Sequence, residues 1–156
     1  MLPRKVFFTK GVGMHEDPLI SFELALRDAG IEKFNIVPVS SVYPPNCIEV
    51  GREEGLSELK PGQIVFCVMA RFTSNEEGRV IYASLGVAIP RDSNSNGYLT
   101  EYMGYCDEGE DVGRYAEEKA RYMLETLGVN VSRTFNITVK SKVEGYTTVL
   151  AAAVFI

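Results

Sequence analysis

The sequence predicts a single α/β domain in which helices cover layered β-sheets. Strand-like and helix-like segments alternate along the 156 residues in the order β-α-β-(β)-β-β-β-α-β-β, without a linker between them. Two strand-like segments, VIYASLGVAI (80–89) and TVLAAAVFI (148–156), are apolar on both faces. Such strands are typically buried on both sides. They indicate either stacked sheets with outer helices or an oligomer that covers one face of a sheet.

The N-terminal third predicts a strand, a helix and a second strand. KVFFT (5–9) has the composition of a strand and precedes a glycine-rich turn at 10–13. A helix is expected within 15–30. The next strand is expected over 34–43, where the chain meets a Pro-Pro pair.

Residues that begin and end helices define the first helix. Asp17 suits the N-cap, Pro18 suits the first helical position, and Gly30 suits the residue after the last turn. Apolar side chains recur at helical spacing and predict one buried face: Leu19, Phe22, Leu26 and Ala29.

The remainder of the chain predicts five strands and one helix. A helix is expected over 107–128, where acidic residues in the first turn suit the positive end of the helix dipole. A polar loop, RDSNSNG (91–97), lies between two of the strands. The strands are expected at 63–72, 79–90, 98–105, 132–143 and 145–156. The side of the helix that is expected to be buried, interrupted only by Lys119, comprises Val112, Tyr115, Ala116, Ala120, Met123 and Leu127.

Composition and charge argue against several classes of function. A net charge of −5 lacks the basic footprint of a nucleic-acid-binding protein, so no nucleic-acid partner is expected. No apolar run approaches the roughly 18 residues of a membrane span, and the N-terminal run is too short for a signal peptide, so no membrane partner is expected. Three cysteines without a CxxC pair, and one histidine, argue against a zinc site or a disulfide framework. They fit a reducing, cytoplasmic location without a bound metal.

Few conventional catalytic groups are available. A serine or cysteine nucleophile activated by histidine would need His15, which lies in a polar loop before a helix. The glycines of GVG and GREEG are typical of turns and not of a phosphate-binding loop. CDEGED (106–111) lacks the pattern of a calcium-binding loop, and a helix N-terminus explains it better.

The remaining polar feature is the pair Ser40-Ser41 within NIVPVSSVYPPN (35–46), at the end of a hydrophobic strand. A serine hydroxyl can attack the preceding carbonyl and convert the amide to an ester. β-Elimination of that ester then cuts the chain and leads to a pyruvoyl group at the new N-terminus. Such a ketone forms a Schiff base with an amine and acts as an electron sink. From these residues alone, a purely structural role for the pair remains the alternative.

Two longer motifs carry a resemblance to a known family. LISFELALRDAGIEKFNIVPVSSVYPP (19–45) resembles the pyruvoyl-dependent arginine decarboxylases, which combine an amphipathic helix, AGI, an asparagine and Ser-Ser-x-x-Pro-Pro. ASLGVAIPRDSNSNGYLTEYMG (83–104) is similar to the second motif of the family, and the terminal AAAVFI is similar to its apolar last strand. The resemblance covers nearly the whole chain, with both motifs in the right order.

The resemblance implies that the single domain, 1–156, cuts itself between Ser40 and Ser41. The products would be a β chain, 1–40, and an α chain, 41–156, which begins with a pyruvoyl cofactor derived from Ser41. Ser40 would become a carboxylate beside the substrate. Asn35 matches the asparagine that assists self-cleavage, and its expected role is donation to the oxyanion of the ester intermediate.

The resemblance also implies the reaction. L-Arginine would be converted to agmatine and CO₂ through a Schiff base with pyruvoyl 41, in polyamine biosynthesis. Glu101 matches the glutamate that donates a proton in turnover and takes part in processing. Glu23 occupies a position where the family can have an aspartate facing the guanidinium, and Glu32 one where a small residue is usual; both are expected substrate contacts. Because Glu23 has the longer side chain, a pyruvoyl decarboxylase for another amino acid, such as histidine, remains an alternative.

The implied architecture is a layered α/β/β/α sandwich. It would assemble as a homotrimer, or a dimer of trimers, with the pyruvoyl site between subunits. An alternative from a different class is an uncleaved, non-enzymatic trimeric scaffold in which the serine pair only ends a strand. The presence or absence of the cut at 40–41 separates these hypotheses.

Overall fold

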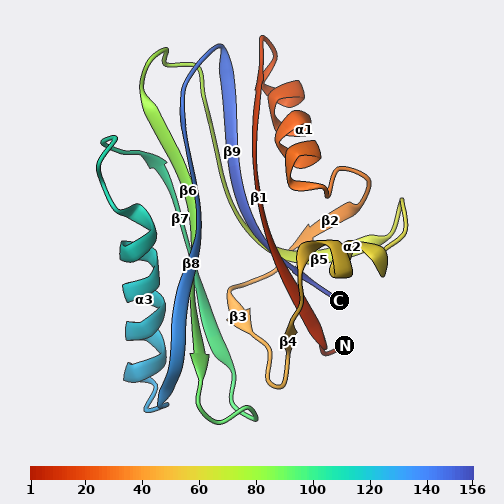
Figure 1. Cartoon of the computed structure of the whole chain (residues 1–156), viewed down its shortest axis with the longest axis vertical. Helices are drawn as coiled ribbons and strands as arrows, with labels where there is room; N and C mark the ends of the chain where they lie inside the picture. Colours follow the sequence, from red (N-terminus) through yellow and green to blue (C-terminus); the bar gives the residue numbers. More distant parts are fainter.

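Two β-sheets lie face to face between outer helices (Figure 1) in a computed structural model that describes residues 1–156. The five-stranded sheet has the order β2-β5-β9-β1-β4, and the four-stranded sheet has the order β3-β7-β6-β8. The helices are α1 (Pro18–Ala29), α2 (Arg52–Ser57) and α3 (Val112–Thr126), and none has the length and apolarity needed to cross a membrane. The strands are β1 (Lys5–His15), β2 (Asn35–Pro38), β3 (Val42–Tyr43), β4 (Ile48–Glu49), β5 (Ile64–Ser74), β6 (Val80–Pro90), β7 (Gly97–Tyr105), β8 (Val131–Lys142) and β9 (Tyr146–Phe155).

Three apolar cores hold the layers together. The largest lies between the sheets and includes Val68, Leu85 and Val149. A second lies between α1 and the five-stranded sheet, and a smaller one lies under α3. Successive residues of β9 enter different cores: Val149 faces the other sheet, whereas Leu150 faces α1. The doubly apolar strands therefore reflect a four-layer α/β/β/α arrangement, as expected.

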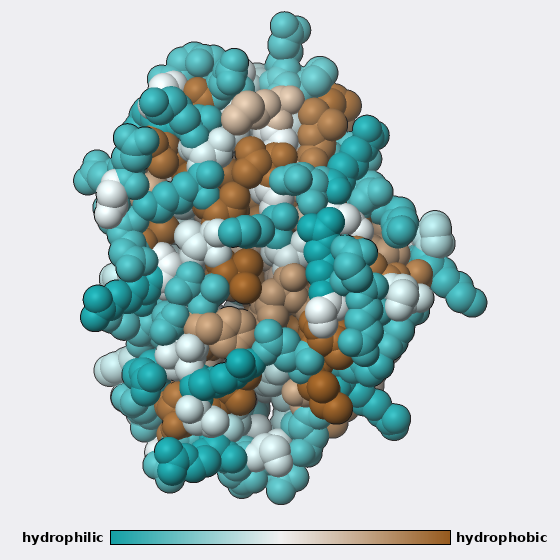
Figure 2. Space-filling view, in the orientation of Figure 1, coloured by the Kyte–Doolittle hydropathy of each residue, from teal (hydrophilic) through white to brown (hydrophobic).

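One face of the molecule exposes the seam between the sheets. Figure 2 shows apolar side chains in a band down the middle of this face. Across the seam, Phe8 of β1 packs edge-to-face on Phe135 of β8, with ring centroids 5.1 Å apart. Aromatic packing thus holds the two sheets together along this seam, where no backbone hydrogen bond links one sheet to the other.

The predicted turn at 10–13 is wrong, because β1 continues to His15 and pairs with β9 from Val6 onward. Gly11 and Gly13 lie directly beneath α1. A Cβ atom on Gly11 would be 2.1 Å from the carbonyl oxygen of Ala25, and one on Gly13 would be equally close to the helix backbone. These glycines therefore permit close contact between strand and helix.

The segment 46–58 contains structure that the sequence did not predict. GREEG is not a turn, since most of it belongs to the short helix α2. A Cβ atom on Gly55 would be 2.2 Å from the ring of Phe7, so this glycine lets α2 pack closely on β1. The short strand β4 precedes the helix and pairs with the start of β1.

The caps of α1 are confirmed. The Asp17 carboxylate accepts the N–H groups of Leu19 and Ile20, and Gly30 ends the helix in the left-handed conformation with φ 78°. The predicted buried face is only partly right, because Leu19 is 71% exposed. Ser21 is buried instead, and its hydroxyl forms a 2.7 Å hydrogen bond with that of Thr148.

The helix predicted at 107–128 is α3. It is shorter than predicted, and a different side of it faces the sheet. It begins at Val112, and Asp111 caps it by accepting the N–H of Arg114 at 3.0 Å. The other acidic residues precede the helix, so the expected acidic first turn is wrong. Tyr115, Met123 and Leu127 are exposed, contrary to the prediction. The residues that face the sheet are Val112, Gly113, Ala116, Ala120 and Leu124.

The predicted strand at 34–43 is two strands in different sheets. β2 ends at Pro38 in the five-stranded sheet, where it pairs in parallel with β5. β3 begins at Val42 in the four-stranded sheet, where it pairs with β7. Ser40 and Ser41 therefore lie on the link that crosses between the sheets. The other five strands are confirmed, with ends shifted by one or two residues.

Candidate active site

The link between β2 and β3 is anchored at both ends by contacts with neighbouring strands. On its upstream side, the Val39 N–H donates to the carbonyl oxygen of Cys67 in β5 at 2.9 Å. On its downstream side, Val42 pairs with Tyr98 of β7. Ser40 is exposed and Ser41 is half-buried. The peptide bond between the two serines is thus held in place without belonging to either sheet.

The side chain of Ser41 contacts a carboxylate. Its hydroxyl donates a hydrogen bond to Oε1 of Glu101, a half-buried residue of β7 that lies opposite Leu85 of β6. Because a carboxylate in this position can accept the hydroxyl proton, it can act as a general base toward the serine oxygen. The structure therefore brings together two residues that are 60 positions apart in the sequence.

Main-chain donors contact both serine carbonyls. The Val42 N–H lies 3.0 Å from the carbonyl oxygen of Ser40, and the Leu99 N–H lies 2.9 Å from that of Ser41. Sequence reasoning did not find these donors, because a backbone N–H has no residue signature. Their positions depend on where β3 meets β7.

A cysteine lies close to the carboxylate of this site. Cys67 of β5 is buried, and burial raises the pKa of its thiol to about 12, with a smaller contribution from the negative charge of Glu101. The thiol is therefore neutral near pH 7 and is not an activated nucleophile.

Within the same chain, the side chain of Asn35 does not contact the serine pair. Its side-chain amide donates to the carbonyl oxygen of Gly62 at 2.8 Å. Since an extended strand rises about 3.3 Å per residue, Asn35 lies roughly 15 Å upstream of Ser40. Asn35 also lines a pocket of about 450 Å³ with Phe22, Leu26, Phe34, Ile36, Pro38, Met69 and Arg71.

The predicted substrate contacts Glu23 and Glu32 lie on α1 and in the segment that follows it. Glu23 is on α1, where its Oε1 lies 3.3 Å from Nε of Arg27. Glu32 is exposed in the turn between α1 and β2. Within one chain, the predicted residues are therefore separated. Ser41 and Glu101 are in contact at the link, Asn35 lines the pocket beside α1, and Glu23 and Glu32 do not line that pocket.

Comparison with known proteins identifies the family. The family model described as pyruvoyl-dependent arginine decarboxylase matches residues 5–156. The chain belongs to this family. It is therefore a carboxy-lyase that depends on a covalently bound pyruvoyl group, which confirms the resemblance carried by the two motifs.

Curated relatives match over the full length of this decarboxylase. It is 70% identical to pyruvoyl-dependent arginine decarboxylase 1 of Archaeoglobus fulgidus, covering 100% of this chain and 99% of the relative. It is 58% identical to decarboxylase 2 of the same organism, covering 100% and 98%, and 51% identical to decarboxylase 1 of Methanosarcina acetivorans, covering 100% and 97%. Among solved structures, a pyruvoyl-dependent histidine decarboxylase at pH 8 matches with a TM-score of 0.44 and 13% identity, over 62% of this chain and 51% of that one. That likeness is too distant to support an inference.

The residues at the link fit the internal formation of a pyruvoyl group. This process needs a serine whose hydroxyl can be deprotonated next to its own peptide bond. In the decarboxylase, Ser41 meets this need through its contact with Glu101. The carbonyl group that would be attacked, that of Ser40, already accepts a hydrogen bond through its oxygen.

Arg71 is a residue of the pocket beside α1 that sequence reasoning missed. Its guanidinium lies over the ring of Phe22, 4.3 Å from the centroid, and it forms no ion pair within 4 Å. A weak sequence signal exists, since this arginine is the one charged residue in the apolar run QIVFCVMARF. The decarboxylase thus presents an aromatic surface and a cation at the pocket that also contains Asn35.

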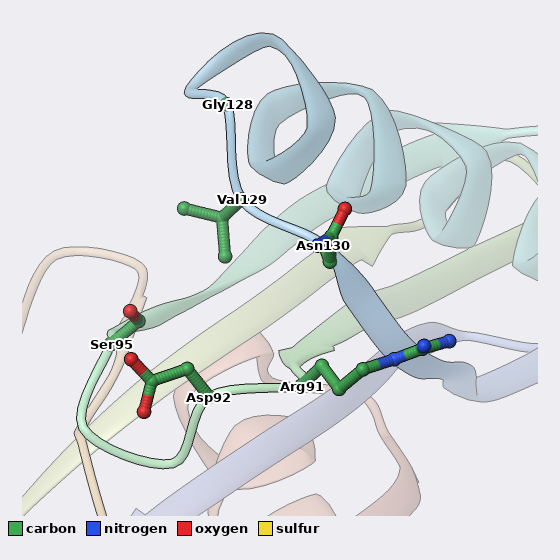
Figure 3. Close-up of a pocket in the computed structure, with 6 residues that line it drawn as sticks. All are labelled: Arg91, Asp92, Ser95, Gly128, Val129 and Asn130. Atoms are coloured by element: carbon green, nitrogen blue, oxygen red, sulfur yellow. The ribbon is translucent and has the colours of Figure 1, made fainter.

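A second cavity, of about 440 Å³, lies at the end of α3 (Figure 3). Figure 3 shows the side chain of Asp92 directed toward Ser95, with Val129 across the cavity from them, whereas Arg91 extends away. The predicted polar loop at 91–97 forms one wall. None of the predicted site residues of the decarboxylase lines this cavity, so it is separate from the candidate active site.

Proposed function

We propose that this chain cuts itself between Ser40 and Ser41 and then converts L-arginine to agmatine and CO₂, as a step of polyamine biosynthesis. The observation that carries the proposal is the contact between the Ser41 hydroxyl and the Glu101 carboxylate, beside an exposed peptide bond. The family match and the names of the relatives support arginine as the substrate. The products of the cut are a β chain, 1–40, and an α chain, 41–156.

The residues at the link take roles in turnover as well. A pyruvoyl group at position 41 supplies the electron sink for loss of CO₂ from an amino acid. Glu101 holds the proton that the α-carbon of the substrate needs afterwards. The Leu99 N–H holds the carbonyl oxygen of residue 41, and Ser40 leaves a carboxylate at the end of the β chain.

A test begins with the unmodified protein. Intact mass measured over time is expected to replace the 17.3 kDa species by two fragments, 1–40 and 41–156, the longer one blocked at its N-terminus. The cut protein is expected to release agmatine from arginine and little histamine from histidine. A chain that stays whole would support the scaffold alternative and contradict the proposal. Preferential release of histamine would instead show that the substrate of this chain is histidine.

We further propose that the active site is completed by a neighbouring copy, in a homotrimer or a dimer of trimers. Asn35 is too far from Ser40 to assist it within one chain, so its proposed role requires the link of another subunit. Glu23, Glu32 and the pocket beside α1 would then bind the arginine held at that link. Three large apolar side chains near the link are exposed in one chain, which supports coverage by a neighbour: Val37, Val39 and Val42.

Mixed assemblies test this arrangement. Asn35→Ala chains alone are expected to process slowly, and Ser41→Ala chains alone are expected to stay uncut. When the two are produced together, some Ser41 residues meet an intact Asn35 from the other chain, so cleavage of the Asn35→Ala chain should rise. Mass spectrometry distinguishes the two chains. If co-production leaves the cleavage rate of the Asn35→Ala chain unchanged, Asn35 does not act across subunits.

Location in the cytoplasm is part of the proposal. The three cysteines, Cys47, Cys67 and Cys106, are all free. Free thiols in every position support a reducing compartment.

A further inference from the structure

We propose that two main-chain N–H groups, those of Val42 and Leu99, act in successive steps of self-cleavage. The Val42 N–H stabilises the oxyanion when Ser41 attacks, and the Leu99 N–H promotes the elimination that cuts the chain. The inference rests on the proposed function, because both steps lead to the pyruvoyl group at position 41. Both donors are backbone groups, so the residue types in the sequence do not reveal these roles.

The first step forms a bond between Oγ of Ser41 and the carbonyl carbon of Ser40. The hydroxyl proton passes to the Glu101 carboxylate, and the electron pair of the carbonyl bond moves onto its oxygen. The Val42 N–H already points at that oxygen from 3.0 Å. The carbon–nitrogen bond then breaks, the nitrogen of Ser41 receives the proton from Glu101, and an ester remains.

Val42 is well placed for this role because the sheet does not use its N–H. Although Val42 is the first residue of β3, its N–H donates backward to Ser40. The Asn35 amide, which was the expected oxyanion donor, is bound to Gly62 in the same chain. Within one chain, the donor that contacts the reacting carbonyl is therefore the backbone N–H two residues downstream. An Asn35 amide from a neighbouring copy would be a second donor to the same oxygen. Loss of one such donor typically slows a reaction by about 10²- to 10³-fold.

The second step breaks the bond between Cβ and Oγ of Ser41. A base removes the proton from the α-carbon, and the Ser40 carboxylate departs with the electrons of the Cβ–Oγ bond. The resulting 2-aminoacrylyl end takes up water and releases ammonia, which leaves the ketone. The α-carbon is next to the carbonyl of Ser41, so negative charge that develops on removal of the proton spreads onto that carbonyl oxygen.

Leu99 is placed to stabilise this charge. Its N–H donates to the Ser41 carbonyl oxygen at 2.9 Å. Leu99 is itself fully buried in the core between the sheets, so the donor is held rigidly. Glu101 is two residues further along the same strand, and one strand thus supplies both the base for the first step and the donor for the second.

Replacing single amide bonds by esters tests each donor without changing a side chain. We would place the α-hydroxy analogue of valine at position 42, or that of leucine at position 99, by chemical ligation or suppression in a cell-free system. The matched control is the same replacement at Val39, whose N–H donates to Cys67 and not to a serine carbonyl. Circular dichroism and thermal unfolding check that each full-length chain is folded.

The expected results differ between the two positions. The ester at position 42 should slow cleavage by about 10²-fold, with no trapped ester between residues 40 and 41. The ester at position 99 should let the ester between Ser40 and Ser41 accumulate. Hydroxylamine would then cut it and leave a free amine on Ser41. The reagent also cuts the introduced ester between residues 98 and 99, and the fragment masses distinguish the two cuts. The control should be cut at close to the unmodified rate.

Three results would each contradict one of the assignments. If the chain altered at position 42 is cut as fast as the control, Val42 is not the oxyanion donor. If the chain altered at position 99 is cut without accumulating ester, Leu99 does not act in the elimination. If the unmodified chain itself stays whole, the proposed function fails, and the donor assignment fails with it.

Discussion

Ser41→Ala is expected to yield a folded chain that stays uncut and has no decarboxylase activity. A methyl group cannot form the ester with Ser40, so neither the cut nor the pyruvoyl group can arise. The loss should be complete, because only a hydroxyl on the residue after the bond can form this ester, and the Ser40 hydroxyl lies on the other side. The removed hydroxyl lies on a half-buried link outside both sheets, so the change should cost little stability. Mass spectrometry and an assay for agmatine measure both effects.

Ser40→Ala is the matched control, since it removes a hydroxyl from the other side of the same bond. Residue 40 supplies only its carbonyl to the first step, and alanine keeps that carbonyl. The Ser40→Ala chain should therefore be cut between residues 40 and 41. Cleavage at this bond in Ser41→Ala would show that another residue is the nucleophile.

Much of the fold could be predicted because apolar periodicity and helix caps are local signals. The first helix was placed correctly from Asp17, Pro18 and Gly30. Only the first part of β1, 5–9, is predicted as a strand, because Gly11 and Gly13 resemble turn residues in sequence. Their actual constraint is the backbone of α1 above them, a contact between segments that only the folded chain brings together.

The break in the predicted strand at 34–43 illustrates a second limit. From Ile36 to Tyr43 the run is apolar except for its serines, so its pattern does not show that its two ends belong to different sheets. This change of sheet is what frees the Ser40–Ser41 bond from both ladders. The feature that makes the pair chemically interesting is therefore one of topology, and local sequence does not encode it.

Only part of the candidate site could be predicted from the sequence, because its residues also depend on how distant segments come together. Motifs named Ser41 and Glu101, and the structure brings these two into contact. Motifs also named Asn35 and Glu23, yet one chain keeps them apart from the serine pair. A motif reports which residues a family retains, but it does not say which subunit supplies them. That distinction needs distances within the folded chain.

Glu101→Gln is expected to keep the fold while slowing both self-cleavage and turnover, each by roughly 10²- to 10⁴-fold, the usual contribution of a general acid or base. Glutamine has nearly the same shape, but its amide cannot take the proton of the Ser41 hydroxyl. The cleavage rate is read from the intact mass over time. The turnover rate is read from agmatine release, divided by the amount of α chain that carries the blocked N-terminus.

Dividing by the blocked α chain separates the two roles of Glu101. If the carboxylate served only in processing, the few chains that do become cut would turn over arginine at the unmodified rate. If it also delivers the proton to the α-carbon, kcat per blocked chain should fall as well. Unmodified rates in both measurements would remove Glu101 from the mechanism.

Glu117→Gln provides the matched control for this substitution. Glu117 is another half-buried carboxylate, and it accepts hydrogen bonds from Thr134 at 2.9 Å and Asn136 at 3.0 Å, under α3. Neutralising it removes the same charge from the same four-layer fold without touching the link. Asn136 can still donate to the amide oxygen, and the Thr134 hydroxyl can accept from the amide NH₂, so cleavage and turnover should remain near the unmodified rates. A comparable loss in Glu117→Gln would mean that the effect of Glu101→Gln arises from stability or overall charge and not from contact with Ser41.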